Sequence, residues 1–233
     1  PASLPYEIYE SAWQGELQKV VKWLRKGGTV DALCSVPTTD GGQIQFTLLH
    51  AAAAGGHLEI VRELLKFGAS IDLPSSLGGT PVMACAGNGH PSILLLLLQH
   101  SASLDLQNNL GGTALMRTAA SGHLSTLSIL LQHSANPDLQ NNLGGTALML
   151  AAHEGHVPCV QALLRAQANT KLLDENGHTA LQHAEQHQTK LQGHTVIARL
   201  IRQHAAPSWP WVVLSVVLGT VATLAFSRTL TAR

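Results

Sequence analysis

The most constraining feature of the sequence is a repeat with a period of 33 residues. The period is marked by five threonines, Thr47, Thr80, Thr113, Thr146 and Thr179. A Gly-His pair follows the first four at a fixed interval, and the last pair, at 193–194, comes 38 residues after its predecessor, which indicates a five-residue insertion. Residues 105–116 and 138–149 are identical. Such a period predicts structural units that stack side by side and pack only against their neighbours.

Each unit has the pattern of two short helices followed by an extended turn. In the unit that begins at Thr113, the threonine can cap a first helix, and Gly122 allows a turn into a second one. The second helix carries an apolar stripe formed by Leu124, Leu127, Leu130 and Leu131. Residues 138–145 are rich in Asn and Gly, as expected for an extended turn. One pair of short helices cannot bury this stripe, so the units must share a continuous core.

These units resemble ankyrin repeats. The resemblance is carried in the first full unit by Thr47-Leu48-Leu49-His50, Ala52-Ala53, Gly56-His57, Val61, Leu64-Leu65 and Gly68-Ala69, and in the next by Thr80-Pro81. It covers roughly residues 5–206. It implies an all-α ankyrin-repeat solenoid, in which helix-turn-helix units carry projecting hairpin turns.

The expected organisation has three parts. Residues 1–46 form a degenerate N-terminal capping repeat and a long loop. Four full repeats and a C-terminal cap follow, at 47–79, 80–112, 113–145, 146–178 and 179–206. Residues 207–233 contain a linker, a predicted transmembrane helix over 209–227 and a short basic tail.

Two departures from the ankyrin pattern predict modest stability. The histidine of the Thr-Pro-Leu-His motif is replaced by Met83, Met116, Met149 and Gln182, so its side-chain hydrogen bond should be lost from most repeats. The glycine at position 68 is replaced in later repeats by Ser101, Ser134 and Gln167. A non-glycine residue held at positive φ costs about 1 kcal/mol.

The resemblance also implies where a partner binds, because ankyrin proteins bind along a groove lined by the projecting turns and the first helices. Leu77, Leu110 and Leu143 occupy the turn tips and predict a row of exposed leucines. The alternative is that each leucine folds back on its own hairpin. Polar residues complete the predicted surface, namely Asn88, Asn109, Asn142, Ser121, His153 and Glu154. They favour an uncharged or mixed protein surface as the partner.

A second apolar surface is predicted on the second helices. Leu95 and Leu96 align with charged residues of the first full repeat, and Ile129 occupies the position of Leu96 one repeat later. All three should therefore face solvent. The alternative is a leucine-rich helix sequence without a role in binding.

The segment from Trp209 to Ser227 predicts a membrane anchor. It contains no charged residue, and its 19 residues would make a helix of about 28 Å, close to the thickness of the bilayer core. Trp209 and Trp211 flank it on one side, and Arg228 and Arg233 on the other. The segment resembles a tail anchor, with the repeats facing the cytosol. A helix docked on the last repeat and an unfolded tail are the alternatives, and the protein would then be cytoplasmic.

Composition excludes several functions. The chain has 14 basic and 14 acidic residues and zero net charge, which argues against nucleic-acid binding. Its three cysteines show no metal-binding spacing and fit a reducing compartment. No phosphate-binding glycine loop or nucleophile elbow occurs. We therefore expect no catalytic residue, no cofactor and no small-molecule substrate.

The 13 histidines do not predict a metal site either. Five of them belong to the repeated Gly-His pairs and are expected to be structural. The best candidates are His183 and His187, near His178 and His194, but two ligands are too few for zinc. The sequence thus predicts a non-enzymatic scaffold or adaptor that binds a protein partner. The alternative is a soluble cytosolic regulatory fragment of a longer protein with an enzyme or zinc-binding domain upstream.

Overall fold

The computed structural model describes residues 4–39, 41–186 and 192–205, which form six pairs of helices and one β-hairpin. The first helices of the pairs are α1 (Tyr6–Gln14), α3 (Leu48–Gly55), α5 (Pro81–Gly87), α7 (Ala114–Ser121), α9 (Ala147–Glu154) and α11 (Ala180–Gln186). The second helices are α2 (Leu17–Arg25), α4 (Leu58–Lys66), α6 (Pro91–Gln99), α8 (Leu124–Gln132), α10 (Val157–Arg165) and α12 (Gln192–Ala205). Strands β1 (Cys34–Pro37) and β2 (Gln43–Phe46) lie between the first two pairs.

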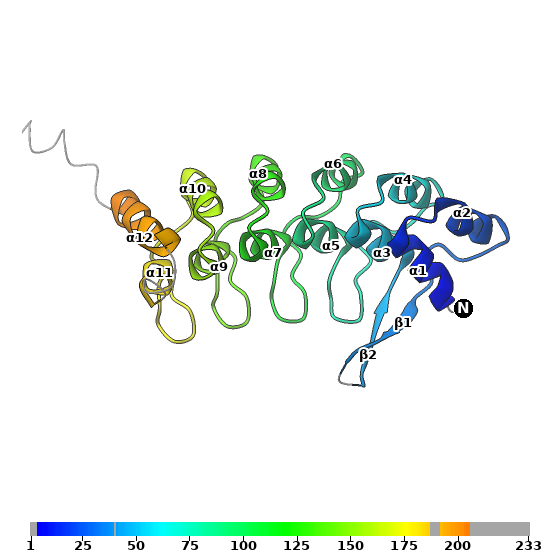
Figure 1. Ribbon diagram of the computed structural model, residues 1–233, viewed down its shortest axis with the longest axis horizontal. Helices are drawn as coiled ribbons and strands as arrows, with labels where there is room; N and C mark the ends of the chain where they lie inside the picture. The colour runs from blue at the N-terminus through cyan, green and yellow to red at the C-terminus, as the bar shows by residue number, and fades with distance from the viewer. Residues whose placement is uncertain (1–3, 40, 187–191, 206–233) are drawn as a thin grey trace, which may run out of the picture.

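The helix pairs stack into an elongated solenoid. The first helices form one row, the second helices form another, and the turns project from the first row away from the second (Figure 1). Each first helix contacts the first helix of the next pair along the whole series from α1 to α11. This arrangement confirms the predicted helical repeat fold, and the pair α1 and α2 lies at its N-terminal end.

The repeated threonines and glycines set the helix boundaries as expected. The Oγ1 atoms of Thr47, Thr80, Thr113 and Thr146 each accept the backbone N–H three residues later, at 3.2–3.4 Å. This bond satisfies one of the N–H groups that a helix start leaves unpaired. Gly122 and Gly155 end α7 and α9 at φ 73° and 80°, where the chain must turn sharply into the second helix.

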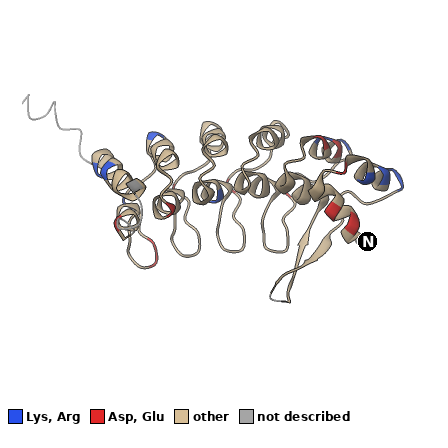
Figure 2. Ribbon diagram, viewed as in Figure 1, with Lys and Arg blue, Asp and Glu red and all other residues tan. Residues whose placement is uncertain are grey.

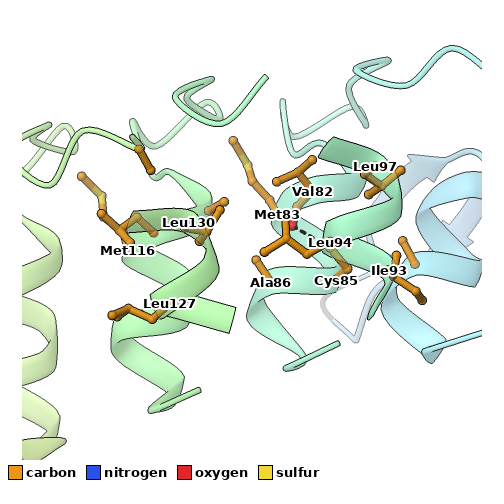
Figure 3. Close-up of a cluster of buried hydrophobic side chains, with 14 of the residues drawn as sticks. Val82, Met83, Cys85, Ala86, Ile93, Leu94, Leu97, Met116, Leu127 and Leu130 are labelled. Atoms are coloured by element: carbon orange, nitrogen blue, oxygen red, sulfur yellow. Dashed lines mark hydrogen bonds between the residues drawn. The ribbon is translucent and has the colours of Figure 1, made fainter. Parts of the chain in front are cut away.

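The core runs continuously between the two helix rows. Figure 3 shows how Val82 and Met83 of α5 lie beside Leu94 and Leu97 of α6, and all four are buried. Leu127 and Leu130 of α8 are fully buried, and Leu131 packs against the same core. Leu124 was expected in this stripe but is 40% exposed, because it is the first residue of α8 and lies next to the turn.

The two departures from the ankyrin pattern have the structural effects that were predicted, with one correction. His50 accepts the backbone N–H of Thr47 through Nδ1 and donates from Nε2 to the carbonyl of Gly79 at 2.9 Å. Met83, Met116 and Met149 are buried in its place. Gln182 retains part of the interaction, since its Oε1 accepts the N–H of Thr179 at 2.7 Å.

The residues that replace the glycine do adopt the left-handed conformation. Ser101, Ser134 and Gln167 have φ of 64°, 66° and 61°, close to the 81° of Gly68. The backbone therefore keeps the same geometry in every repeat, although only glycine adopts it without steric cost.

The long loop expected before residue 47 is instead a β-hairpin, so the chain is not entirely helical. Strands β1 and β2 pair in antiparallel register, with Val36 opposite Ile44 and Cys34 opposite Phe46. The alternating apolar residues and the Gly41-Gly42 turn favour this structure. The hairpin also joins the solenoid, because the N–H of Ser76 donates to the carbonyl of Gln45 at 3.1 Å.

The predicted transmembrane helix over 209–227 lies outside the described residues. Across residues 4–39, 41–186 and 192–205, no helix has both the length and the apolar composition needed to cross a bilayer.

Candidate protein-binding surface

Four projecting turns, here called the fingers, consist of residues 75–79, 108–112, 141–145 and 174–178. Each finger is closed at its base by a backbone hydrogen bond, from Asn108 to Gly112 and from Asn141 to Gly145 at 3.0 Å, for example. The Oδ1 atom of Asn108 also accepts the N–H groups of Leu110 and Gly112. The fingers are therefore ordered by their own hydrogen bonds before any partner arrives.

A ladder of hydrogen bonds joins successive fingers. The N–H of Asn109 donates to the carbonyl of Leu77, and that of Asn142 donates to the carbonyl of Leu110, both at 3.0 Å. The amide group of Asn142 also donates to the carbonyl of Asn109 at 3.0 Å. Asn109 and Asn142, both predicted as binding residues, are exposed. Some of their hydrogen-bond donors, however, already hold neighbouring fingers together.

The three predicted leucines are exposed at the finger tips. Their exposed fractions are 51% for Leu77, 74% for Leu110 and 58% for Leu143. At least half of each of these residues is therefore open to solvent. Because the fingers are one repeat apart and bonded to one another, the leucines form an ordered apolar row.

The other predicted residues lie at the C-terminal ends of the first helices. Asn88, Ser121, His153 and Glu154 are all exposed. A cleft of about 330 Å³ lies between the last two fingers, and its walls include Leu143, His153 and Glu154. The finger tips and the first-helix ends therefore border one continuous surface, here called the finger surface.

Two aromatic residues at the N-terminal end of the finger surface were not predicted. The carbonyl of Trp13 accepts a hydrogen bond from His57, as that of Ala54 does from His90, so Trp13 occupies the first-helix position of a repeat. Trp13 and Tyr6 are 47% and 51% exposed and line a cleft of about 410 Å³. Alignment of α1 with the later first helices was the signal that could have found Trp13.

The second predicted apolar surface is largely absent. Leu95 is exposed, but Leu96 is buried and Ile129 is half-buried against the core. The helices α6 and α8 contact each other, so residues at this position pack between neighbouring second helices and do not face solvent. The prediction for Leu96 and Ile129 was wrong.

The charged residues lie mainly at the two ends of the solenoid, as Figure 2 shows. Between residues 73 and 153 the charged residues are Asp105, Arg117 and Asp138. Asp105 and Asp138 each accept a backbone N–H from the following repeat, at 3.0 and 2.7 Å. The middle of the finger surface is therefore almost uncharged.

The Gly-His histidines have a structural role. Nε2 of His90, His156 and His194 donates to a carbonyl in the first helix of the preceding repeat, at 2.9–3.0 Å. His194 therefore contacts His153 through this bond and is not a member of a metal site with His183. His187 lies outside the described residues.

A different set of polar residues meets at the last finger. Nε2 of His183 lies 2.9 Å from Oδ2 of Asp174, and Nδ1 of His178 lies 3.8 Å from the same oxygen. Burial raises the pKa of Asp174, but hydrogen bonds from the His178 backbone and the His183 side chain lower it more, so its pKa lies below the ordinary value. These three residues could hold a metal ion.

The three cysteines are buried and free. Burial raises the pKa of the Cys85 thiol to about 12, so it stays protonated at neutral pH and is a poor nucleophile. Burial likewise raises the pKa of Cys34 and of Cys159.

Comparison with known proteins agrees with the repeat geometry. The family described as ankyrin repeats (3 copies) matches residues 8–108, 49–141, 83–169 and 115–207. A search of curated proteins finds no match. Ankyrin repeats are generally non-enzymatic and point to a role in protein–protein interaction. With matched segments from residue 8 to residue 207, the chain belongs to the ankyrin-repeat family.

Proposed function

We propose that the protein is a scaffold or adaptor that binds a protein partner on the finger surface. The observation that carries the proposal is the row of exposed leucines at Leu77, Leu110 and Leu143, since apolar rows on ordered loops favour protein contacts. The neighbouring polar residues Asn88, Ser121, His153 and Glu154 would supply hydrogen bonds at the rim.

The order of the fingers supports tight binding. A partner that binds a flexible loop must bear the entropy of ordering it, at about 0.5–1.5 kcal/mol for each immobilised side chain. The hydrogen bonds within each finger and between fingers have already restricted the backbone. The free energy of burying the leucines is therefore available for affinity.

The charge distribution indicates the class of partner. The middle of the finger surface carries Arg117 as its only charged side chain that is not bonded to the next repeat, within the described residues. Such a surface offers little attraction to a polyanion and suits an apolar peptide or helix face. The exposed Trp13 and Tyr6 provide an aromatic contact at one end.

The test is affinity capture with two matched triple variants. Leu77, Leu110 and Leu143 are changed to Ser in the first variant. In the control, the exposed residues Phe67, which follows α4, Leu95 of α6 and Leu124 of α8 are changed to Ser. We expect proteins captured by the wild type to be lost from the first variant and retained by the control, as measured by quantitative mass spectrometry. Retention by the first variant and loss from the control would place the partner on the second helices and contradict the proposal.

We also propose that the segment 209–227 tethers the protein to a membrane with the repeats in the cytosol. The support is its uncharged sequence, its length and the flanking Trp209 and Arg228. A tether would raise the local concentration of a captured partner at the membrane. Fractionation with carbonate extraction tests this idea: the full chain should pellet with membranes, whereas residues 1–206 should not. If both remain soluble, the tether proposal is wrong, but the partner proposal stands.

A further inference from the structure

We propose that Asp174, His178 and His183 form a Zn²⁺ site at the last finger. The three ligand atoms lie within 4.8 Å of one another. The proposal is independent of the partner proposal, because its test uses zinc alone.

The last repeat differs from the two before it at all three ligand positions. Position 174 is Asn in both earlier fingers, at Asn108 and Asn141, and position 178 is Gly in both, at 112 and 145. The position of His183 on the first helix is Arg117 and then Leu150 in the earlier repeats. At all three positions the last repeat therefore holds a residue type that can bind a metal. The structure places these three side chains close together.

The geometry fits a zinc ion. Zinc binds imidazole nitrogen and carboxylate oxygen at 2.0–2.2 Å, which places two ligand atoms of a tetrahedral site about 3.3 Å apart. Oδ2 of Asp174 is 2.9 Å from Nε2 of His183 and 3.8 Å from Nδ1 of His178, on either side of that value. Small side-chain rotations would equalise the two distances, and the partly exposed His178 has room to make them.

The surrounding structure orients the ligands. Oδ1 of Asp174 accepts the N–H groups of Asn176 and His178, which leaves Oδ2 facing the two imidazoles. Nδ1 of His183 is buried with no hydrogen-bond partner among the described residues, so Nε2 is the nitrogen that faces Asp174 and would bind zinc, with the ring proton then carried by Nδ1. The amide nitrogen of Gln186 lies 3.4 Å from Nε2 of His178, and a flip of that amide would place its oxygen to accept the N–H of His178 Nε2 once Nδ1 binds the metal.

The ligand types select zinc over the hard cations. Calcium and magnesium prefer a shell of oxygen atoms, whereas two imidazoles with one carboxylate suit zinc. The three residues leave a fourth position for water. Asp174 and His183 line the 330 Å³ cleft together with Glu154 and Glu175, so water can reach the site.

The earlier fingers supply conservative variants for the test. Asp174→Asn keeps the turn hydrogen bonds that Asn108 and Asn141 make, but removes the carboxylate. His178→Gly and His183→Leu likewise introduce residues that the equivalent positions already hold. His133→Gln, at an exposed histidine of another repeat, is the control. All variants are made in the 233-residue chain, and circular dichroism with EDTA checks that they fold.

Zinc titration by calorimetry, with Co²⁺ absorption as a spectroscopic check, gives the outcome. We expect one saturable site in the wild type and in His133→Gln, a zinc-dependent rise in melting temperature in both, and at least about a tenfold loss of affinity in each ligand variant. The absence of a saturable site, or a site that survives in the triple ligand variant, overturns the proposal.

Discussion

The repeats at 47–79 and 113–145 share a backbone plan but are stabilised by different chemistry. The first has the buried His50 hydrogen bonds and Gly68 in the left-handed conformation, and its helix α4 carries charged residues that form ion pairs. The second has Met116 and Ser134 at these positions, and α8 carries no charged residue. The two repeats nevertheless have the same helix caps and turns.

This difference indicates that the repeat geometry depends mainly on the threonine cap and on packing between neighbouring repeats. Local polar interactions such as that of His50 can be replaced without changing the backbone. Each such interaction should still change the free energy of unfolding. Exchanging residues between the two repeats measures the size of that change.

The largest effect is expected from the buried histidine. His50→Met should lower the free energy of unfolding by about 1–3 kcal/mol, because the Thr47 N–H loses its partner in a buried site. The reverse change, Met116→His, should raise it by about 1 kcal/mol through a bond to the Gly145 carbonyl. Urea unfolding followed by circular dichroism measures both. If His50→Met leaves the free energy of unfolding unchanged, the hydrogen bonds of His50 do not make the first repeat more stable than the second.

A smaller effect is expected at the left-handed position. Ser134→Gly should stabilise the protein by up to about 1 kcal/mol, and Gly68→Ser should destabilise it by a similar amount. Ser128→Gly, which makes the same substitution inside α8, is the control and should be destabilising. If Ser134→Gly and Ser128→Gly change the free energy of unfolding in the same direction, the backbone of Ser134 is not strained.

The smallest effect is expected from pH. Burial lowers the pKa of His50, although the Gly79 carbonyl opposes this, so below the unfolded pKa of about 6.5 the unfolded chain binds more protons than the folded one. The stability that His50 contributes is therefore fully present above that pH and is lost as pH falls below it. The difference in unfolding free energy between the wild type and His50→Met should therefore become smaller as the pH falls from roughly 7.5 to roughly 5.5. A constant difference would contradict the role of burial.

Most of the fold could be predicted from the sequence because the 33-residue period aligns each position with four or five others. Such alignment identified the caps at Thr80 and Thr113 and the strained residues Ser101 and Ser134. The hairpin at 34–46 lies beside the first finger but does not share the repeated finger sequence, so its alternating residues had to be interpreted alone. Leu96 was misplaced because its burial depends on how closely α6 and α8 approach.

The surface was predictable only in part. The tip leucines follow from the period, and the structure has them exposed. The grouping of Asp174, His178 and His183 depends on the turn of the last finger, which brings together residues four and nine positions apart. The signal in the sequence is the set of departures at 174, 178 and 183 from the preceding repeat, whereas the spacing of the histidines alone does not reveal the carboxylate.

The copied segments 105–116 and 138–149 pose a problem for the folding chain. Either segment can occupy the other's place with no local penalty, and looping out one repeat adds only a modest chain entropy cost. A stack that skips a repeat is thus a kinetic competitor of the native one. Discrimination depends on the helices that flank the copies, since skipping would leave Leu127 and Leu130 of α8 in water. Burial of these two side chains therefore favours the native alignment of the repeats over the skipped one.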